Sequence, residues 1–223
     1  MTRLRAGTTA ATGSAADFIP PRPTLTKLRE AAGSCRGCHL WMHATQTVFG
    51  EGPRTAEVML VGEQPGDLED RAGHPFVGPA GKLLDTGLMQ AGIDRSRVYV
   101  TNSVKHFKFV TIERGRRLHK KPNAAEVRAC HPWLLEEIRL IKPRVIVALG
   151  ATAAQALLGK QFRVTQDRGK PMPSALAEAV VATVHPSAVL RAPDDTRDEA
   201  RQEFIADLKR VADYLNRSPS ARA

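Results

Sequence analysis

The chain has 223 residues, enough for one well-packed domain and too few for two ordinary ones to be expected. Apolar residues make up 42% of the chain and charged residues 25%, and no run of about 18 apolar residues is present, so we do not expect insertion into a membrane. Lys and Arg total 33 against 23 acidic residues, a formal net charge of +10 that favours polyanionic partners and makes nucleic acid the leading partner class.

The two ends of the chain differ in composition from its middle. Residues 1–23 are rich in Ala, Thr, Gly and Pro, and residues 218–223 are similarly plain. We expect disordered tails on either side of one domain that spans residues 24–217. Because residues 6–17 lack the apolar segment of a secretory signal, we also expect a cytoplasmic protein.

Four short apolar runs predict buried parallel strands. In chain order they are Glu57–Val61, Val98–Asn102, Arg144–Leu149 and Val180–Val184. Apolar residues spaced three or four apart predict helices at Gly81–Ala91, Ala124–Ile141, Ala151–Leu158 and Asp198–Leu215. This alternation predicts an α/β protein, a three-layer α/β/α sandwich around a four-stranded parallel sheet.

Polar residues follow the predicted strands. Glu63 and Gln64 come after the first strand, Asn102 ends the second, Gly150 follows the third and His185 follows the fourth. Ligands of such sheets bind outside the carboxyl ends of the strands, so these segments are expected to converge on a single site.

The three cysteines form a second group of candidate site residues. Cys35 and Cys38 have the two-residue separation seen in zinc and iron–sulfur sites, whereas Cys130 lies far away on a predicted helix. Three cysteines are one ligand short of the usual four. The candidates for the fourth ligand include His39, His43 and His131.

Two glycine-rich segments, residues 62–67 and 73–81, follow the first strand. Glycine allows backbone amides to approach a ligand, and an aromatic side chain in such a loop, here Phe76, can face a planar base. The simpler interpretation is an ordinary strand-to-helix loop. The glycine spacing is not that of a dinucleotide-binding fingerprint.

Together these two segments resemble motif A of the family 4 and UdgX-type uracil-DNA glycosylases, and Glu63 and Gln64 match the UdgX version. The sequence His185-Pro186-Ser187 resembles the second active-site motif of the same superfamily. The resemblance covers most of residues 35–191 and implies a uracil-DNA glycosylase-like fold.

The resemblance also implies roles in recognising uracil. Phe76 would stack on a flipped base, Asn102 would bond its Watson–Crick edge, Gln64 would contact it through the backbone amide, and His185 would bond the O2 carbonyl. The residue types suit these roles, because an amide offers both donors and an acceptor and a His donor can stabilise charge on the departing base. In structural interpretations Phe76 would be a core residue, Asn102 would cap a turn and His185 would hold a loop.

The resemblance extends to the cysteines. Family 4 glycosylases have a cysteine after the second strand, and His106 stands at the matching place here. The implied metal ligands are therefore Cys35, Cys38, His106 and Cys130. A [4Fe–4S] cluster with one His ligand is the expected cofactor, and zinc in a Cys₃His site is the alternative.

An Arg-rich stretch within residues 107–129 separates this chain from ordinary family 4 enzymes. It resembles the loop of UdgX proteins whose histidine is the covalent residue, here His119, with Gly-Arg-Arg-Leu-His in place of the more familiar Lys-Arg-Arg-Ile-His. Glu63 would assist by stabilising positive charge or accepting the imidazole proton. In the simpler interpretation the stretch is a basic loop that contacts phosphates. The expected DNA-binding residues are Arg116, Arg117, Lys120, Lys121 and Arg191.

The implied activity is excision of uracil from single- or double-stranded DNA, followed by a covalent bond between His119 and C1′ of the deoxyribose. Such a protein would complete one reaction, with His119, Glu63 and His185 as catalytic residues, and we expect a monomer. Two alternatives stay open. One is a turning-over iron–sulfur uracil-DNA glycosylase, and the other is a non-enzymatic iron–sulfur DNA-binding protein.

Overall fold

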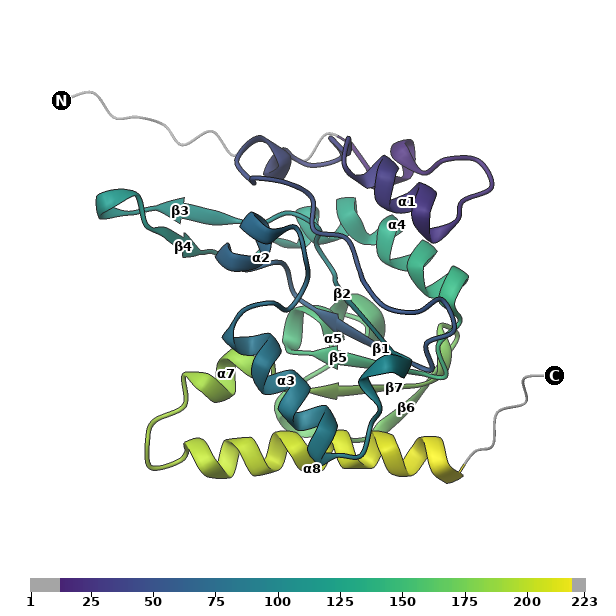
Figure 1. The fold of residues 1–223 in the computed structure, drawn as a ribbon, viewed down its shortest axis with the longest axis vertical. Helices are drawn as coiled ribbons and strands as arrows, with labels where there is room; N and C mark the ends of the chain where they lie inside the picture. The colour runs from purple at the N-terminus through teal and green to yellow at the C-terminus, as the bar shows by residue number, and fades with distance from the viewer. Residues whose placement is uncertain (1–12, 218–223) are drawn as a thin grey trace.

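The computed structural model describes residues 13–217, so the predicted C-terminal tail and the first 12 residues of the predicted N-terminal tail lie outside the described residues. The helices and short 3₁₀ helices (η) are η1 Ala15–Phe18, α1 Leu25–Ala32, η2 His39–Met42, α2 Asp67–Ala72, α3 Pro79–Gln90, η3 Arg95–Arg97, η4 Glu113–Gly115, α4 Ala124–Ile141, α5 Ala151–Leu158, α6 Val164–Asp167, α7 Pro186–Leu190 and α8 Arg197–Arg217. The strands are β1 Val58–Gly62, β2 Val98–Asn102, β3 Phe109–Thr111, β4 Arg117–His119, β5 Val145–Leu149, β6 Pro171–Ser174 and β7 Ala177–Thr183. Figure 1 shows their arrangement.

The central sheet has five strands in the order β2-β1-β5-β7-β6. The first four are parallel, as expected, but β6 pairs antiparallel with β7, so the prediction of a four-stranded, purely parallel sheet was wrong. The missed strand contains Pro171 and Pro173, which do not read as a buried strand. Proline lacks the N–H that a central strand must donate, and β6 accommodates it because it lies at the edge of the sheet.

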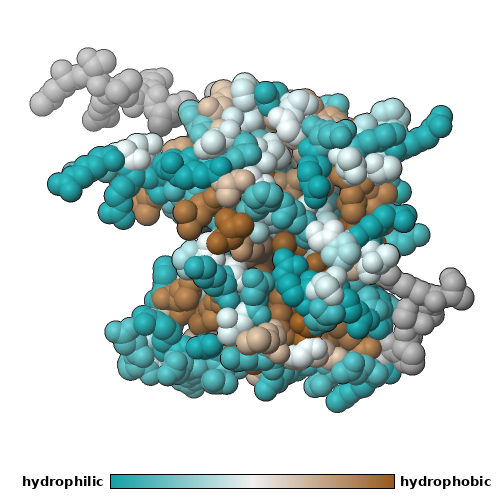
Figure 2. Space-filling model, viewed as in Figure 1, coloured by the Kyte–Doolittle hydropathy of each residue, from teal (hydrophilic) through white to brown (hydrophobic). Residues whose placement is uncertain are grey.

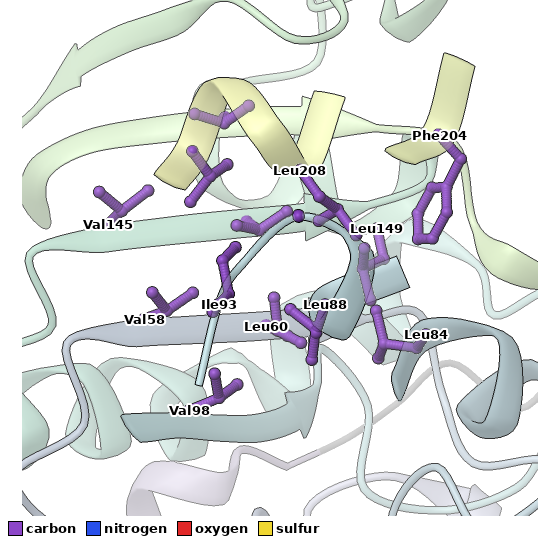
Figure 3. Close-up of a cluster of buried hydrophobic side chains, with 14 of the residues drawn as sticks. Val58, Leu60, Leu84, Leu88, Ile93, Val98, Val145, Leu149, Phe204 and Leu208 are labelled. Atoms are coloured by element: carbon purple, nitrogen blue, oxygen red, sulfur yellow. The ribbon is translucent and has the colours of Figure 1, made fainter. Parts of the chain in front are cut away.

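Alternating side chains of the strands enter two separate cores. One face of the sheet packs against α3 and α8, where Leu60 and Leu149 meet Leu84, Phe204 and Leu208 (Figure 3). The other face packs against α4 and α5 through a second set of buried residues, Met59, Ile146, Leu134, Ile138 and Ala153. Helices therefore cover both faces, which explains why the strands are apolar throughout rather than alternating.

A third apolar cluster joins the N-terminal segment to α4. Ala15 is fully buried in it beside Leu28 and Trp133, and Ser14 caps η1. Ala15, which lies within the predicted N-terminal tail, therefore fills space next to α4. Composition alone gave no sign of this contact.

A two-stranded antiparallel hairpin, β3–β4, projects from the body of the domain (Figure 1). Its register pairs Phe109 with His119, and its turn uses left-handed backbone at Arg114 and Gly115. The Arg-rich stretch is therefore a hairpin with a defined register rather than an irregular loop.

Within residues 13–217, no helix has both the length and the hydropathy needed to cross a bilayer.

Candidate active site

A cleft of about 740 Å³ opens at the carboxyl ends of the parallel strands. It lies at the ends of β1 and β5, which are neighbours in the sheet. The strand that follows β1 in the chain, β2, lies on the other side of β1, so the chain order reverses between β1 and β5 and this is the topological switch point of the sheet. Figure 2 shows hydrophobic surface in the hollow beneath the hairpin and hydrophilic surface along the hairpin itself. The residues lining the cleft include Glu63, Gln64, Phe76, Asn102, His119, Thr152, His185 and Arg191. The predicted convergence of separate segments is thus present.

The two glycine-rich segments are tied together by one carboxylate. Glu69 accepts the backbone N–H of Gly66 at 3.1 Å and that of Gly78 at 2.8 Å. Phe76 has a left-handed backbone, with φ of 58°, and a side chain at Gly81 would clash with the Phe76 carbonyl. The loop therefore depends on Gly81 to hold Phe76 at the cleft.

Phe76 faces the second motif across the cleft. Its ring and that of His185 are nearly parallel, with centroids 6.2 Å apart and planes inclined by 24°. Both residues line the cleft, so two flat surfaces are available to a planar ligand.

Asn102 ends β2 and lines the floor of the cleft. It is 3% exposed, and a side chain at Gly62 would clash with its Oδ1 atom. Within residues 13–217, no protein group hydrogen-bonds its side-chain amide. Both the donor and the acceptor of this amide are therefore available to a ligand.

His185 is held as a neutral donor. Its Nδ1 atom accepts the backbone N–H of Ser187 at 3.1 Å, so we assign the ring proton to Nε2. Burial lowers the pKa of His185 to about 4, and the charges of Arg191 and His119 add to the effect. A neutral imidazole that donates from Nε2 is suited to a carbonyl oxygen that gains negative charge.

Gln64 anchors the hairpin at its base. Its Nε2 atom donates to the carbonyls of Lys108 and Lys120, both at 3.1 Å, and its Oε1 atom accepts the Lys108 N–H at 3.2 Å. The side chain is thus committed to the two strands of the hairpin. Only its backbone amide is left for a ligand, which is the contact predicted for Gln64.

Arg117 is a second anchor of the hairpin. Its guanidinium bonds Asp67, lies 2.6 Å from Asp70 Oδ2 and covers the rings of Phe107 and Phe109. Its side chain is 11% exposed. The charge of Arg117 is therefore paired inside the protein, and its predicted contact with DNA stays a prediction. Its positive charge alone could not reveal this pairing.

His119, at the end of β4, lies beside Glu63. Its Nε2 atom is 3.4 Å from Glu63 Oε1, and the two side chains are 49% and 21% exposed. Burial lowers the pKa of His119, the Arg191 charge lowers it further, and Glu63 opposes the shift. His119 is therefore a largely neutral imidazole near pH 7, open to the cleft and next to a carboxylate that can accept its proton.

The other four residues predicted to bind DNA are exposed, namely Arg116, Lys120, Lys121 and Arg191. Lys121 and Arg191 also line the cleft. Positive charge is therefore available around the opening of the cleft.

The three cysteines are unpaired, buried members of the N-terminal apolar cluster. Burial raises the pKa of Cys130 to about 12, and Cys35 and Cys38 contribute to that shift through their charges. His106 is 5% exposed, and its Nε2 atom lies 2.8 Å from Thr47 Oγ1.

In this geometry, no three His, Cys, Asp or Glu side chains among residues 13–217 are close enough to hold a metal ion. The donor set of three thiols and one imidazole suits either zinc or an iron–sulfur cluster chemically. The metal site therefore stays a prediction from the sequence.

Thr152 is a cleft residue that sequence reasoning missed. Its Oγ1 atom donates to Glu63 Oε2. In the sequence it is a threonine in the first turn of a predicted helix, which usually has only a local structural role. The one available signal was its position two residues after Gly150, at the end of a parallel strand.

Comparison with known proteins places the chain in a family. The model of the uracil DNA glycosylase superfamily matches residues 49–209. The chain is 36% identical to a type-4 uracil-DNA glycosylase of Thermotoga maritima, over 84% of this chain and 93% of that protein. A type-4 enzyme of Pyrobaculum aerophilum is 40% identical over 82% of this chain and 91% of its own length.

A type-5 uracil-DNA glycosylase of Pyrobaculum aerophilum is also similar, at 30% identity over 74% of this chain and 76% of that protein. The family match spans both motifs of the cleft and the sheet that carries them. The chain therefore belongs to the uracil-DNA glycosylase superfamily.

Proposed function

We propose that this protein excises uracil from DNA and then captures the resulting sugar through a covalent bond to His119. The observation that carries the proposal is the position of His119. It lies 3.4 Å from Glu63, in the same cleft as the base-recognition residues Phe76, Asn102 and His185. The similarity to type-4 enzymes supports the excision step.

Recognition needs a uracil that has been flipped out of the strand, because the glycosidic bond is otherwise inaccessible. Phe76 would stack on the base, and the free amide of Asn102 would match the N3–H donor and the O4 acceptor of uracil. The Nε2–H of His185 would donate to the O2 carbonyl. These contacts select a pyrimidine with two carbonyl groups.

Excision breaks the C1′–N1 bond, and the electron pair leaves with uracil as an anion. The sugar becomes oxocarbenium-like, and the neutral His185 donor stabilises the charge on the departing base. A ring nitrogen of His119 then gives its lone pair to C1′, which produces an imidazolium. Glu63 stabilises that positive charge and can accept the proton from the other ring nitrogen.

A second candidate is a turning-over glycosylase, in which water attacks C1′ and His119 is only a residue of the hairpin. The similarity to type-4 uracil-DNA glycosylases supports the excision step of this candidate equally. A third is a DNA-binding protein without activity. The three candidates differ in whether uracil is released and whether protein stays on the DNA.

One experiment separates these candidates. The protein is mixed with an end-labelled uracil-containing oligonucleotide, and the products are analysed on a denaturing gel together with detection of free uracil. We expect released uracil and a denaturation-resistant complex from the wild type, and released uracil without a complex from His119→Ser. Uracil release without any complex would favour turnover, and neither product would favour DNA binding alone.

We also propose a [4Fe–4S] cluster held by Cys35, Cys38, His106 and Cys130, with zinc as the alternative. Three of these side chains are buried cysteines of one apolar cluster, and His106 is buried as well. None of these four residues lines the cleft, so such a group would supply structural stability rather than take part in the reaction. Iron and sulfide in protein purified anaerobically, with less of both in His106→Ala, would support the cluster. Stoichiometric zinc without sulfide would replace it.

A further inference from the structure

Thr152 occupies a fixed position at the edge of the cleft. It lies in the first turn of α5 and is 7% exposed. The turn before it is held by Gly150, whose φ is 88° and whose N–H donates to the Thr183 carbonyl at 2.8 Å. A side chain at Gly150 would come within 3.1 Å of His185 Cβ, so this turn packs closely against the second motif.

The two carboxylate oxygens of Glu63 have different partners, Thr152 and His119. Thr152 Oγ1 donates to Glu63 Oε2, whereas Glu63 Oε1 lies 3.4 Å from His119 Nε2. Within residues 13–217, no other group bonds the Glu63 side chain. Glu63 is 21% exposed, so without Thr152 its carboxylate would be free to turn toward water.

We infer that Thr152 is a positioning residue for the covalent step, because its hydroxyl holds the Glu63 carboxylate in the orientation that faces His119. This inference rests on the proposed function and assigns a role to a residue outside the recognised motifs. Thr152 does not touch the reacting atoms. It acts through Glu63, which stabilises the imidazolium formed when the His119 nitrogen bonds C1′ or accepts its proton.

We predict that loss of the Thr152 hydroxyl changes the ratio of the two reaction products, the covalent adduct and the free abasic strand. After uracil leaves, the oxocarbenium-like sugar is captured either by His119, which gives the adduct, or by water, which gives a free abasic strand. A Glu63 carboxylate that is no longer held supports capture by His119 less well. Thr152→Val keeps the shape of the side chain and removes the hydroxyl. Since hydrogen bonds to charged groups contribute strongly, we expect the ratio of adduct to abasic strand to fall about tenfold.

The experiment measures this ratio on a denaturing gel under single-turnover conditions, after alkaline cleavage reveals the abasic strand. Thr152→Ser keeps the hydroxyl and is expected to retain a ratio near that of the wild type. Thr152→Ala provides a second variant without the hydroxyl, in case Thr152→Val does not fold.

The matched control is Thr183→Val. The Thr183 hydroxyl donates at 2.6 Å to Asp207 Oδ2, so this change removes a similar buried bond between a threonine and a carboxylate outside the cleft. It is expected to lower stability and leave the ratio unchanged. A purely structural role of Thr152 would give the same result as this control.

A double-mutant cycle tests the route through Glu63. In the Glu63→Gln background, Thr152→Val is expected to cause no further change in the ratio, because the group it positions is gone. A wild-type ratio in Thr152→Val and Thr152→Ala would overturn the inference, as would an equal further loss in the Glu63→Gln background. If the wild type forms no adduct at all, the proposed function itself is wrong, which is a different outcome.

Discussion

At the scale of single residues, Asn102 is the group that decides which base the cleft accepts. Replacing Asn102 by Asp exchanges an amide donor for an acceptor, so the contact with O4 of uracil is lost and the N4 amine of cytosine is better matched. We expect single-turnover uracil release to slow about 10- to 100-fold. The control is Asn123→Asp, at the N-cap of α4, where either residue is tolerated. Unchanged kinetics in Asn102→Asp would mean that Asn102 does not contact the base.

The pKa of His119 predicts how adduct formation depends on pH. Burial and the Arg191 charge hold this pKa below the usual 6.5, and only the neutral imidazole can attack. Adduct formation is therefore lost as the pH falls through the lowered pKa, and it levels off at higher pH, where the imidazole is neutral. In Arg191→Gln the pKa rises, so the midpoint of the rate profile moves to higher pH. A wild-type midpoint above pH 7 would contradict the assignment of His119 as a neutral nucleophile.

At the scale of elements, the β3–β4 hairpin depends on Arg117. Arg117→Met removes the charged partner of Asp70, which is fully buried, and breaks the link between the hairpin and α2. Breaking a buried ion pair leaves an unpaired charge, so we expect a loss of about 3 kcal/mol in the free energy of unfolding. Urea denaturation measures this loss, and hydrogen exchange is expected to become faster in the hairpin amides.

Arg116→Met is the control for the hairpin. Arg116 is the neighbouring arginine and is exposed, so its loss is expected to change stability by less than about 0.5 kcal/mol. Equal stability of the two variants would show that the bonds of Arg117 do not hold the hairpin.

The elements differ in how far the sequence predicts them. The bounds of β2, α4 and α5 agree with the predictions, because buried apolar runs and three- to four-residue spacing identify strands and helices directly. The hairpin was expected as a loop, because strands of only three residues are too short to show a periodic signal. The edge strand β6 was missed because its prolines are typical of turns.

The site was predicted best where side chains follow strands. Parallel strands bring their carboxyl ends together, so Glu63, Asn102 and His185 lie in one cleft as expected. The burial of Arg117 and the bond from Thr152 to Glu63 depend on which side chains meet in three dimensions. A charge or a hydroxyl in the sequence does not reveal its partner.

At the scale of the whole molecule, the excess of positive charge predicts salt-sensitive binding to DNA. Arg116, Lys120 and Lys121 are exposed on or next to the hairpin. If each of the three contacts one phosphate, changing all three to Gln should reduce the magnitude of the slope of the logarithm of the DNA-binding constant against the logarithm of salt concentration by about 2 to 3. Fluorescence anisotropy with DNA that lacks uracil measures binding without reaction. Lys209→Gln on α8 is the control, and an unchanged slope in the triple variant would place the DNA elsewhere.

The most direct test of the covalent mechanism identifies the modified residue. Protein that has reacted with uracil-containing DNA is digested with nuclease and protease, and the peptides are sequenced by tandem mass spectrometry. We expect one peptide to carry the mass of a deoxyribose phosphate, with the fragment ions assigning it to His119. The same mass on another residue, or no modified peptide in a reaction that has released stoichiometric uracil, would contradict the proposal that His119 captures the sugar.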